Sequence, residues 1–144
     1  MNKSLVIAVD YDQTCRAGNF PHVYEDIGAA RVLKKLVAVG HKIILYTLRC
    51  DRLDKVPNDL GIEPINGLYL TEAINWFADN GIPLYGVNAH PLQKQLTDSP
   101  KCWADIFIDD RAIGTPLLKN VRISNEHYVN WYEMEELLTE RDIL

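Results

Sequence analysis

Short runs of mostly apolar residues recur along the chain, separated by segments in which apolar and polar positions alternate with a helical period. The unbroken runs cover residues 5–9 and 43–46, and weaker runs cover 84–87, which includes Gly86, and 104–108, which includes Asp105. A strand that is buried on both faces of a parallel sheet needs no polar alternation, so these runs predict the strands of such a sheet.

Between the first two runs, five apolar side chains fall on one face of a helix. The helix is expected to begin after Asp26, a candidate N-cap, and to end at Gly40. A second helix is predicted over 70–77 and ends before Gly81. A third begins at Asn130, with Glu133 three residues later, which is a capping pattern. The apolar residues of these helices are Ala29, Val32, Leu33, Leu36, Val37, Leu70, Ile74, Phe77, Trp131, Met134 and Leu138.

The succession of strand, helix and strand gives right-handed parallel units. The predicted fold class is therefore α/β, a doubly wound, Rossmann-like parallel sheet with helices on both faces. A chain of 144 residues suits a single domain spanning 1–144, without a large cap domain.

Composition narrows the function classes. Hydrophobic residues make up 47% and charged residues 24%, as in soluble globular proteins, and no segment has the length of a membrane span. The net charge of −5 disfavours a nucleic-acid partner. Cys15, Cys50 and Cys102 are too few and too dispersed for a disulfide framework or a zinc site. We expect reduced thiols and a cytoplasmic location.

Polar side chains follow the predicted strands where each strand ends. Asp10 and Asp12 follow the first strand, Thr47 and Arg49 the second, and Asp109 and Asp110 the fourth, while Lys101 lies just before the fourth. In an open parallel sheet these ends meet at one edge, where ligands bind. Clustered carboxylates bind hard cations such as Mg²⁺, and hydroxyl and ammonium groups bind phosphoryl oxygens.

These motifs, in this order, resemble those of the haloacid dehalogenase (HAD) superfamily, whose members are mostly phosphatases. The resemblance is closest to small capless proteins described as hydrolases or capsule-biosynthesis phosphatases. It covers most of the domain and implies a HAD-like fold. The matching segments are residues 6–14, residues 43–47, Lys101 and residues 106–110.

The resemblance implies a Mg²⁺-dependent phosphomonoester hydrolase that acts through an aspartyl-phosphate intermediate. Asp10 would be the nucleophile, and Asp12 the acid and base whose backbone carbonyl also joins the magnesium shell. Thr47 would bind phosphoryl oxygens, and Lys101 would neutralise negative charge. Magnesium would be held by Asp10, Asp12, Asp109 and Asp110, and the catalytic set would be Asp10, Asp12, Thr47 and Lys101. Thr14 and Arg49 are the candidates for substrate binding.

Some assignments stay open. Lys94 is an alternative to Lys101, and Asp105 is an alternative acidic ligand, although its place in the predicted strand favours a buried or edge role. The family usually has glycine where this chain has Gln13, which could reshape the loop after the first strand.

The substrate is expected to be a phosphorylated small molecule or saccharide, with neither nucleic acid nor a membrane as partner. Since 15–25 and 50–66 are too short for a large cap, a homo-oligomer could cover the open site.

Two other functions use similar residues. A small acidic metal-dependent nuclease would need the carboxylates but not Asp12, Thr47 or Lys101. A phosphate-accepting receiver-like signalling module would carry its phosphorylated aspartate after the third strand, where this chain has Asn88.

Overall fold

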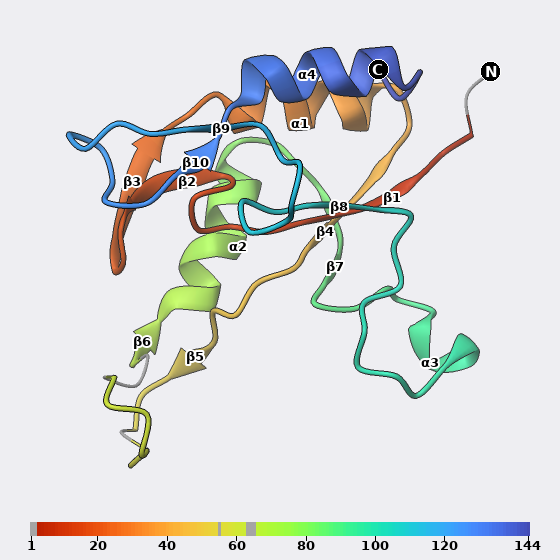
Figure 1. Cartoon of the computed structure of the whole chain (residues 1–144). Helices are drawn as coiled ribbons and strands as arrows, with labels where there is room; N and C mark the ends of the chain where they lie inside the picture. The colour runs from red at the N-terminus through yellow and green to blue at the C-terminus, as the bar shows by residue number, and fades with distance from the viewer. Residues whose placement is uncertain (1–2, 55, 63–65) are drawn as a thin grey trace.

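The computed structural model describes residues 3–54, 56–62 and 66–144 (Figure 1). Within these residues, four strands form a parallel sheet, and three pairs of short strands form small antiparallel sheets. In chain order the elements are β1 (Val6–Val9), β2 (Arg16–Asn19), β3 (His22–Asp26), α1 (Ala29–Ala38), β4 (Lys42–Leu45), β5 (Asp51–Arg52), β6 (Gly67–Leu68), α2 (Tyr69–Asp79), β7 (Leu84–Val87), α3 (Gln93–Leu96), β8 (Ile106–Ile108), β9 (Leu117–Leu118), β10 (Tyr128–Val129) and α4 (Trp131–Glu140).

The parallel sheet has the order β7-β4-β1-β8. β1 is central and pairs with β4 on one side and β8 on the other. Its residues Ile7, Ala8 and Val9 are buried, as expected for a strand covered on both faces. The α/β class and the parallel sheet predicted from the apolar runs are therefore confirmed.

The order of the strands explains which face each connection covers. The chain steps from β1 to β4 to β7 in one direction, so right-handed connections place α1 and α2 on the same face. It then crosses back past β1 to β8, and this connection lies on the other face. In Figure 1, α1 and α4 lie side by side above the strands, whereas α3 lies below them.

The two faces are covered unequally. Ile7, Val9, Ile43 and Leu45 pack in one large core with α1, α2 and α4. On the opposite face Ala8 and Ile44 pack with Cys102, from a connection whose only helix among the described residues is the four-residue α3. The expectation of helices on both faces is thus not confirmed, because a loop containing one helical turn covers the second face.

The helix ends agree only partly with the sequence pattern. The side chain of Asn130 accepts hydrogen bonds from the amides of Tyr132 and Glu133, so the predicted N-cap of α4 is confirmed. Asp26 does not cap α1. Its carboxylate accepts from the amide of Gly28, which is the N-cap and has a φ of 88°. The strand expected over 104–108 begins only at Ile106.

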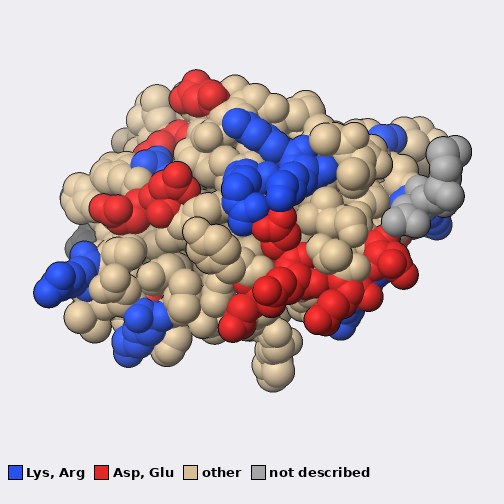
Figure 2. Space-filling model, turned by 90° about the horizontal axis from the view of Figure 1, so that it is seen from above, with Lys and Arg blue, Asp and Glu red and all other residues tan. Residues whose placement is uncertain are grey.

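The surface around α1 and α4 mixes charges of both signs. Figure 2, which views the molecule from above, shows Lys and Arg side chains directly beside Asp and Glu side chains. Arg31 and Lys35 of α1 both form ion pairs with Glu135 of α4. This face is therefore not a continuous basic surface.

The cysteines form no disulfide bonds, and the described helices include no candidate membrane span. All three cysteines are free, as expected, and Cys15 and Cys102 are buried. Burial raises the pKa of the Cys15 thiol well above its usual value, with Asp10 and Asp12 adding to the effect, which agrees with a packing role. Among the described residues, no helix combines the length and apolarity needed to cross a bilayer.

Candidate functional site

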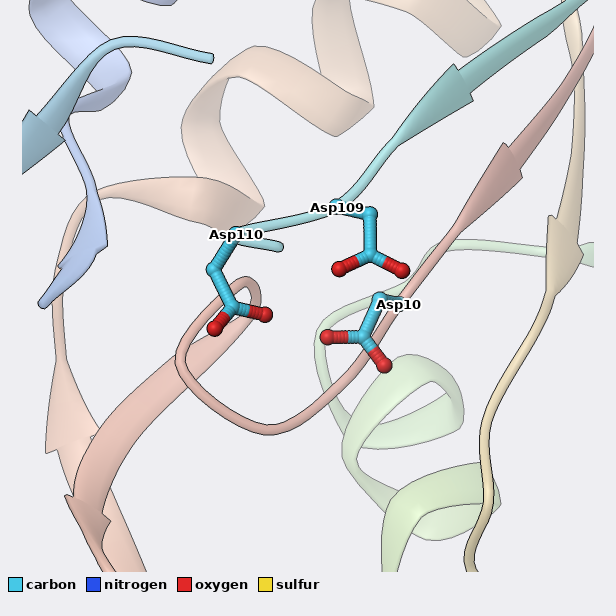
Figure 3. Close-up of side chains that lie close together, drawn as sticks. All are labelled: Asp10, Asp109 and Asp110. Atoms are coloured by element: carbon cyan, nitrogen blue, oxygen red, sulfur yellow. The ribbon is translucent and has the colours of Figure 1, made fainter. Parts of the chain in front are cut away.

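Three carboxylates meet at the carboxyl ends of β1 and β8. Oxygen atoms of Asp10, Asp109 and Asp110 all lie within 4.8 Å of one another. Figure 3 shows Asp10 at the end of β1 and the other two at the end of β8, with the carboxylates surrounding a common space. β1 and β8 are neighbours where the strand order reverses, which is the usual ligand-binding position of such sheets.

The hydroxyl of Thr14 links two of these carboxylates. It lies 2.9 Å from Asp10 Oδ2 and 3.2 Å from Asp110 Oδ1, and it accepts a hydrogen bond from the Asp110 amide at 3.1 Å. The backbone carbonyl of Thr14 accepts from the buried indole N–H of Trp131 in α4. The fully buried Thr14 therefore contacts two carboxylates of the cluster, and its expected role in substrate binding stays a prediction.

The crowded carboxylates alter each other's ionisation. The pKa of Asp10 is raised to about 8, first because burial disfavours the charged form, and then by Asp110 and the negative charge of Asp109. Burial likewise raises the pKa of Asp110, and Asp109 adds to it. Without a counter-charge, this cluster retains a proton near neutral pH.

These residues fit a hard divalent cation. The donor set consists of carboxylate oxygens, which Mg²⁺ and Ca²⁺ prefer, and the oxygens are close enough to share one ion. A cation would also offset the repulsion that raises the pKa of Asp10. The prediction that Asp10, Asp109 and Asp110 act together as ligands is consistent with this geometry.

The cluster opens into a cavity of about 760 Å³. That volume is typical of a small-molecule site. The wall combines acidic, basic, neutral polar, and apolar or aromatic side chains. The lining residues are Asp10, Asp12, Gln13, Gly18, Asn19, Phe20, Tyr46, Thr47, Leu48, Arg49, Asn88, Pro100, Asp109, Asp110, Arg111, Asn125 and Glu126.

Asp12 lies in the cavity wall, but its carboxylate is not part of the cluster. Arg49 Nη2 donates to Asp12 Oδ1 at 2.7 Å, and Arg49 Nε donates to both carboxylate oxygens at 3.2 and 3.0 Å. The side chain of Asp12 is therefore not a ligand of the cluster here, because both of its oxygens face the guanidinium. The expected contact of its backbone carbonyl with a metal stays a prediction.

Arg49 differs most from its expected environment. An arginine after a strand is usually solvated, yet Arg49 is only 2% exposed. Burial alone would lower its pKa, but the hydrogen bonds and charge of Asp12 outweigh burial and raise it. Arg49 is thus a charged group inside the cavity wall, and in this structure its partner is Asp12.

Thr47 lines the cavity, as expected. Its amide donates to Asn88 Oδ1 at 2.8 Å, and its hydroxyl accepts from the amide of Arg49 at 3.1 Å. Asn88 has a φ of 58°, a left-handed conformation that asparagine tolerates better than most residues. Asn88 therefore joins the end of β7 to the end of β4, and its place directly after a predicted strand was the available signal for it.

Neither candidate lysine lines the cavity. Lys101 and Lys94 are both exposed. The backbone of Lys101 is fixed by Gln93, whose side chain donates to its carbonyl at 2.7 Å, but its neighbour Pro100 is the residue that lines the cavity. Asp105 is also remote from the cluster, since its carboxylate accepts from the amide of Val6 at the start of β1.

Gln13 has a defined structural role. Its φ of 62° lies in the region that favours glycine. Its side-chain amide donates to the carbonyl of Gly18 and its side-chain oxygen accepts from the amide of Gly18, which ties the loop after β1 to the β2–β3 hairpin. A Cβ on Gly18 would lie 2.2 Å from the carbonyl oxygen of His22, so the hairpin requires glycine there.

Arg111, Asn125 and Glu126 also line the cavity, although the sequence did not single them out. Arg111 directly follows the acidic pair, and the adjacency was a signal for it. Asn125 and Glu126 lie between β9 and β10, far from the motifs in the sequence. The amide of Asn125 donates to Asn19 Oδ1 in the hairpin, so this pairing depends on the tertiary fold.

Comparison with known proteins gives one informative similarity. No protein-family model matches the chain, and no curated protein matches it. A solved structure of a conserved protein from Bacteroides thetaiotaomicron is similar, with 28% sequence identity and a TM-score of 0.66. The match covers 96% of this chain and 93% of that protein.

Proposed function

We propose that this protein is a Mg²⁺-dependent phosphomonoester hydrolase of the HAD type. The observation that carries the proposal is the position of Asp10. It ends the central strand, belongs to a carboxylate cluster that fits a cation, and lines an open cavity. The motif order that resembles the superfamily supports the same assignment, including a Rossmann-like core.

The reaction has two phosphoryl transfers. A carboxylate oxygen of Asp10 forms a bond to phosphorus while the bond from phosphorus to the ester oxygen breaks, and Asp12 gives the departing alkoxide a proton. A water oxygen then bonds to phosphorus, the aspartyl-phosphate bond breaks, and the water proton passes to Asp12. A bound Mg²⁺ supplies positive charge that lowers the repulsion between Asp10 and the phosphate.

Other residues of the cavity bind the phosphoryl group in this proposal. Thr47 lines the cavity, and its hydroxyl donates to a phosphoryl oxygen. Lys101 follows Pro100 of that wall, and its exposed side chain has the freedom to turn toward the phosphate. Arg111 is a second cationic candidate, because it lines the cavity beside Asp110.

The open cavity supports a proposal for the substrate class. We propose a phosphorylated small molecule or saccharide, with a second copy of the chain as a candidate cover. The proposed location is the cytoplasm, and the proposed partners include neither nucleic acid nor a membrane.

A metal-dependent nuclease is the second candidate. The specific observation in its favour is that Lys101 lies outside the cavity wall, whereas the carboxylate cluster fits a cation that would activate water without Lys101. A receiver-like module gains no such support, since β7 ends at Val87 and is followed by an asparagine.

The test is a hydrolysis assay with phosphomonoesters and phosphodiesters, with Mg²⁺ and after its removal by a chelator. The proposal predicts Mg²⁺-dependent release of phosphate from monoesters, lost in Asp10→Asn and retained in the exposed control Asp98→Asn. Cleavage of diesters alone would favour the nuclease. Wild-type turnover by Asp10→Asn would reject the proposed nucleophile.

A further inference from the structure

The contacts of Arg49 join four separate segments of the chain. Its guanidinium donates to Asp12 after β1 and to the carbonyl of Tyr69 at the start of α2, the latter at 3.2 Å. Its Cζ lies 4.5 Å from the ring centroid of Tyr11 and 5.3 Å from that of Phe20 in the hairpin. A planar guanidinium suits this combination of stacking and a forked contact, which an ammonium cannot reproduce.

A second carboxylate stands close to the same guanidinium. Glu72 Oε2 lies 3.7 Å from Arg49 Nη1. The other oxygen, Oε1, is buried and has no hydrogen-bond partner within the described part of the chain. An unpaired buried acceptor is costly, so a nearby donor is favourable. Glu72 therefore offers Arg49 a second anion, one turn into α2, while Asp12 takes the direct hydrogen bonds.

We propose that Arg49 is a positioning residue for proton transfer by Asp12, and that it does not bind the substrate. This inference rests on the proposed phosphatase function. The guanidinium holds Asp12 out of the carboxylate cluster, so that its carboxylate is not consumed as a ligand of the cation. Glu72, Tyr69 and the aromatic rings fix the guanidinium in turn.

The geometry matches one stage of the reaction. When the bond from phosphorus to the ester oxygen breaks, the proton on Asp12 passes to that oxygen and Asp12 becomes a carboxylate. Hydrogen bonds from a guanidinium stabilise a carboxylate more strongly than hydrogen bonds from neutral donors. The three hydrogen bonds from Arg49 therefore hold the side chain of Asp12 in one position after it has given up its proton, and Asp12 then takes a proton from the attacking water.

This role predicts an effect that depends on the leaving group. An alkoxide leaves poorly without a proton, whereas para-nitrophenolate leaves without one. Acid catalysis contributes about 10²–10⁴-fold. Arg49→Met should therefore slow the first-turnover release of ethanol from ethyl phosphate by roughly that factor. It should slow the first-turnover release of para-nitrophenolate by less than about tenfold.

The experiment measures first-turnover release of both alcohols by rapid quench, with saturating Mg²⁺. The variants are Arg49→Met, Asp12→Asn and the double variant. The neighbouring Arg52→Met, outside the cavity wall, serves as the control and should behave like the wild type. If Arg49 acts through Asp12, both single variants selectively lose activity toward ethyl phosphate. The double variant then loses no more activity than Asp12→Asn alone.

A structural role for Arg49 would give a different result. Equal loss with both substrates, or additive losses in the double variant, would overturn the proposal. Arg49→Lys keeps the charge but not the forked contact, and it covers the case in which Arg49→Met does not fold. A folded Arg49→Lys should show the same selectivity for the leaving group, to a smaller degree. An unselective loss in a folded Arg49→Lys would also overturn it.

Failure of the proposed function is distinguishable from failure of this inference. If the wild type releases neither alcohol, the phosphatase assignment itself fails. Calorimetric titration with Mg²⁺ alone gives a measurement that does not depend on phosphatase activity. It tests whether Arg49 holds Asp12 outside the cluster. Arg49→Met should bind Mg²⁺ no more weakly than the wild type, since no cluster ligand is removed. A large gain in affinity would also agree, because it would show that a released Asp12 joins the ligands, whereas lost affinity in a folded variant would contradict the proposal.

Discussion

Asp10 and Asp12 are separated by one residue, yet they occupy opposite electrostatic environments. Asp10 is buried against Asp109 and Asp110, and its pKa is raised to about 8. Asp12 faces the guanidinium of Arg49, from which it accepts three hydrogen bonds. The first carboxylate lacks a positive partner among the described side chains of the cluster, and the second has one built into the fold.

In the proposed mechanism, this difference in environment gives two identical groups separate roles. Carboxylates whose environments differ can divide a reaction into an attack on phosphorus and a proton transfer. Asp10 needs positive charge, which a bound cation would supply, while Asp12 needs none from the cation. The cluster is thus suited to a metal and a nucleophile, and the Asp12–Arg49 pair to an acid and base.

The largest effect should come from removing the nucleophile. Asp10→Asn leaves an amide that cannot form the aspartyl-phosphate, so kcat for a phosphomonoester should fall by about 10⁴-fold or more. Asp12→Asn should retain more activity toward an activated ester than Asp10→Asn. Steady-state assays of both variants on para-nitrophenyl phosphate make the comparison, and equal losses would remove the distinction between the two carboxylates.

Asp10→Asn, which should lower activity, should instead raise the stability of the protein when no metal is bound. The folded pKa of Asp10 is about 8, above its ordinary value of 3.8, so the folded state binds the proton more tightly than the unfolded state. The wild type then loses stability as the pH rises from 3.8 toward 8. Since one pKa unit corresponds to about 1.4 kcal/mol, Asp10→Asn should be more stable at high pH by a few kcal/mol.

Urea unfolding in a chelator, at several pH values, measures this effect. The stability gain of Asp10→Asn should grow with pH up to about 8 and then level off. Asp98→Asn, an exposed carboxylate, is the control. A gain that does not vary with pH would show that Asp10 ionises normally in the folded protein.

Magnesium affinity should distinguish the role of the carboxylate cluster from that of the Asp12–Arg49 ion pair. Asp109→Asn removes a charged ligand and should weaken Mg²⁺ binding by at least about tenfold. Asp12→Asn should change it by less, because its side chain lies outside the cluster. Calorimetric titrations of the two variants under identical conditions test this. A greater loss in Asp12→Asn than in Asp109→Asn would place Asp12 among the ligands.

Thr14 tests how the cluster is organised. Thr14→Val keeps the shape but removes the hydroxyl that contacts Asp10 and the Asp110 amide. Loss of a buried hydrogen-bonding group should cost about 1–3 kcal/mol, measured by urea unfolding. Thr139→Val, whose exposed hydroxyl donates to a helix carbonyl, should cost less. Equal costs would indicate that Thr14 does not support the cluster.

The smallest effect is expected at Gln13. Gln13→Gly relieves a left-handed backbone conformation but loses the side-chain bonds to Gly18, whereas Gln13→Ala loses the bonds and keeps the strain. Gln13→Ala should therefore be less stable than Gln13→Gly by about 1 kcal/mol. Thermal unfolding of the pair measures the difference, and the reverse order would mean that the backbone of residue 13 relaxes freely.

The sequence predicted the features that depend on local pattern. Apolar runs located β1, β4 and β7, and the residues after β1 and β8 located Asp10, Asp109 and Asp110 because the ends of parallel strands share an edge. The N-cap at Asn130 was predictable because capping chemistry is local. To predict these features, only the spacing of apolar residues along the chain and the rule that parallel strand ends share one edge are needed.

The missed parts depend on segments far apart in the sequence. Arg49 is buried because Phe20 and Tyr69, from two different connections, pack around it, and no local pattern shows this. The asymmetry of the sheet arises because the connection from β7 to β8 carries only a four-residue helix. The exposed position of Lys101 follows from the path of the same connection, which Gln93 fixes through four hydrogen bonds to its backbone.

The most direct test of the central claim is to trap the phosphoryl group on the protein. The protein is mixed with para-nitrophenyl phosphate and Mg²⁺, quenched in acid after a short reaction time, and digested for mass spectrometry. The account predicts a phosphoryl group on Asp10 in the wild type and in Asp12→Asn, and none in Asp10→Asn. Turnover of the monoester with the phosphoryl group on another residue, or with the same adduct in Asp10→Asn, would contradict it.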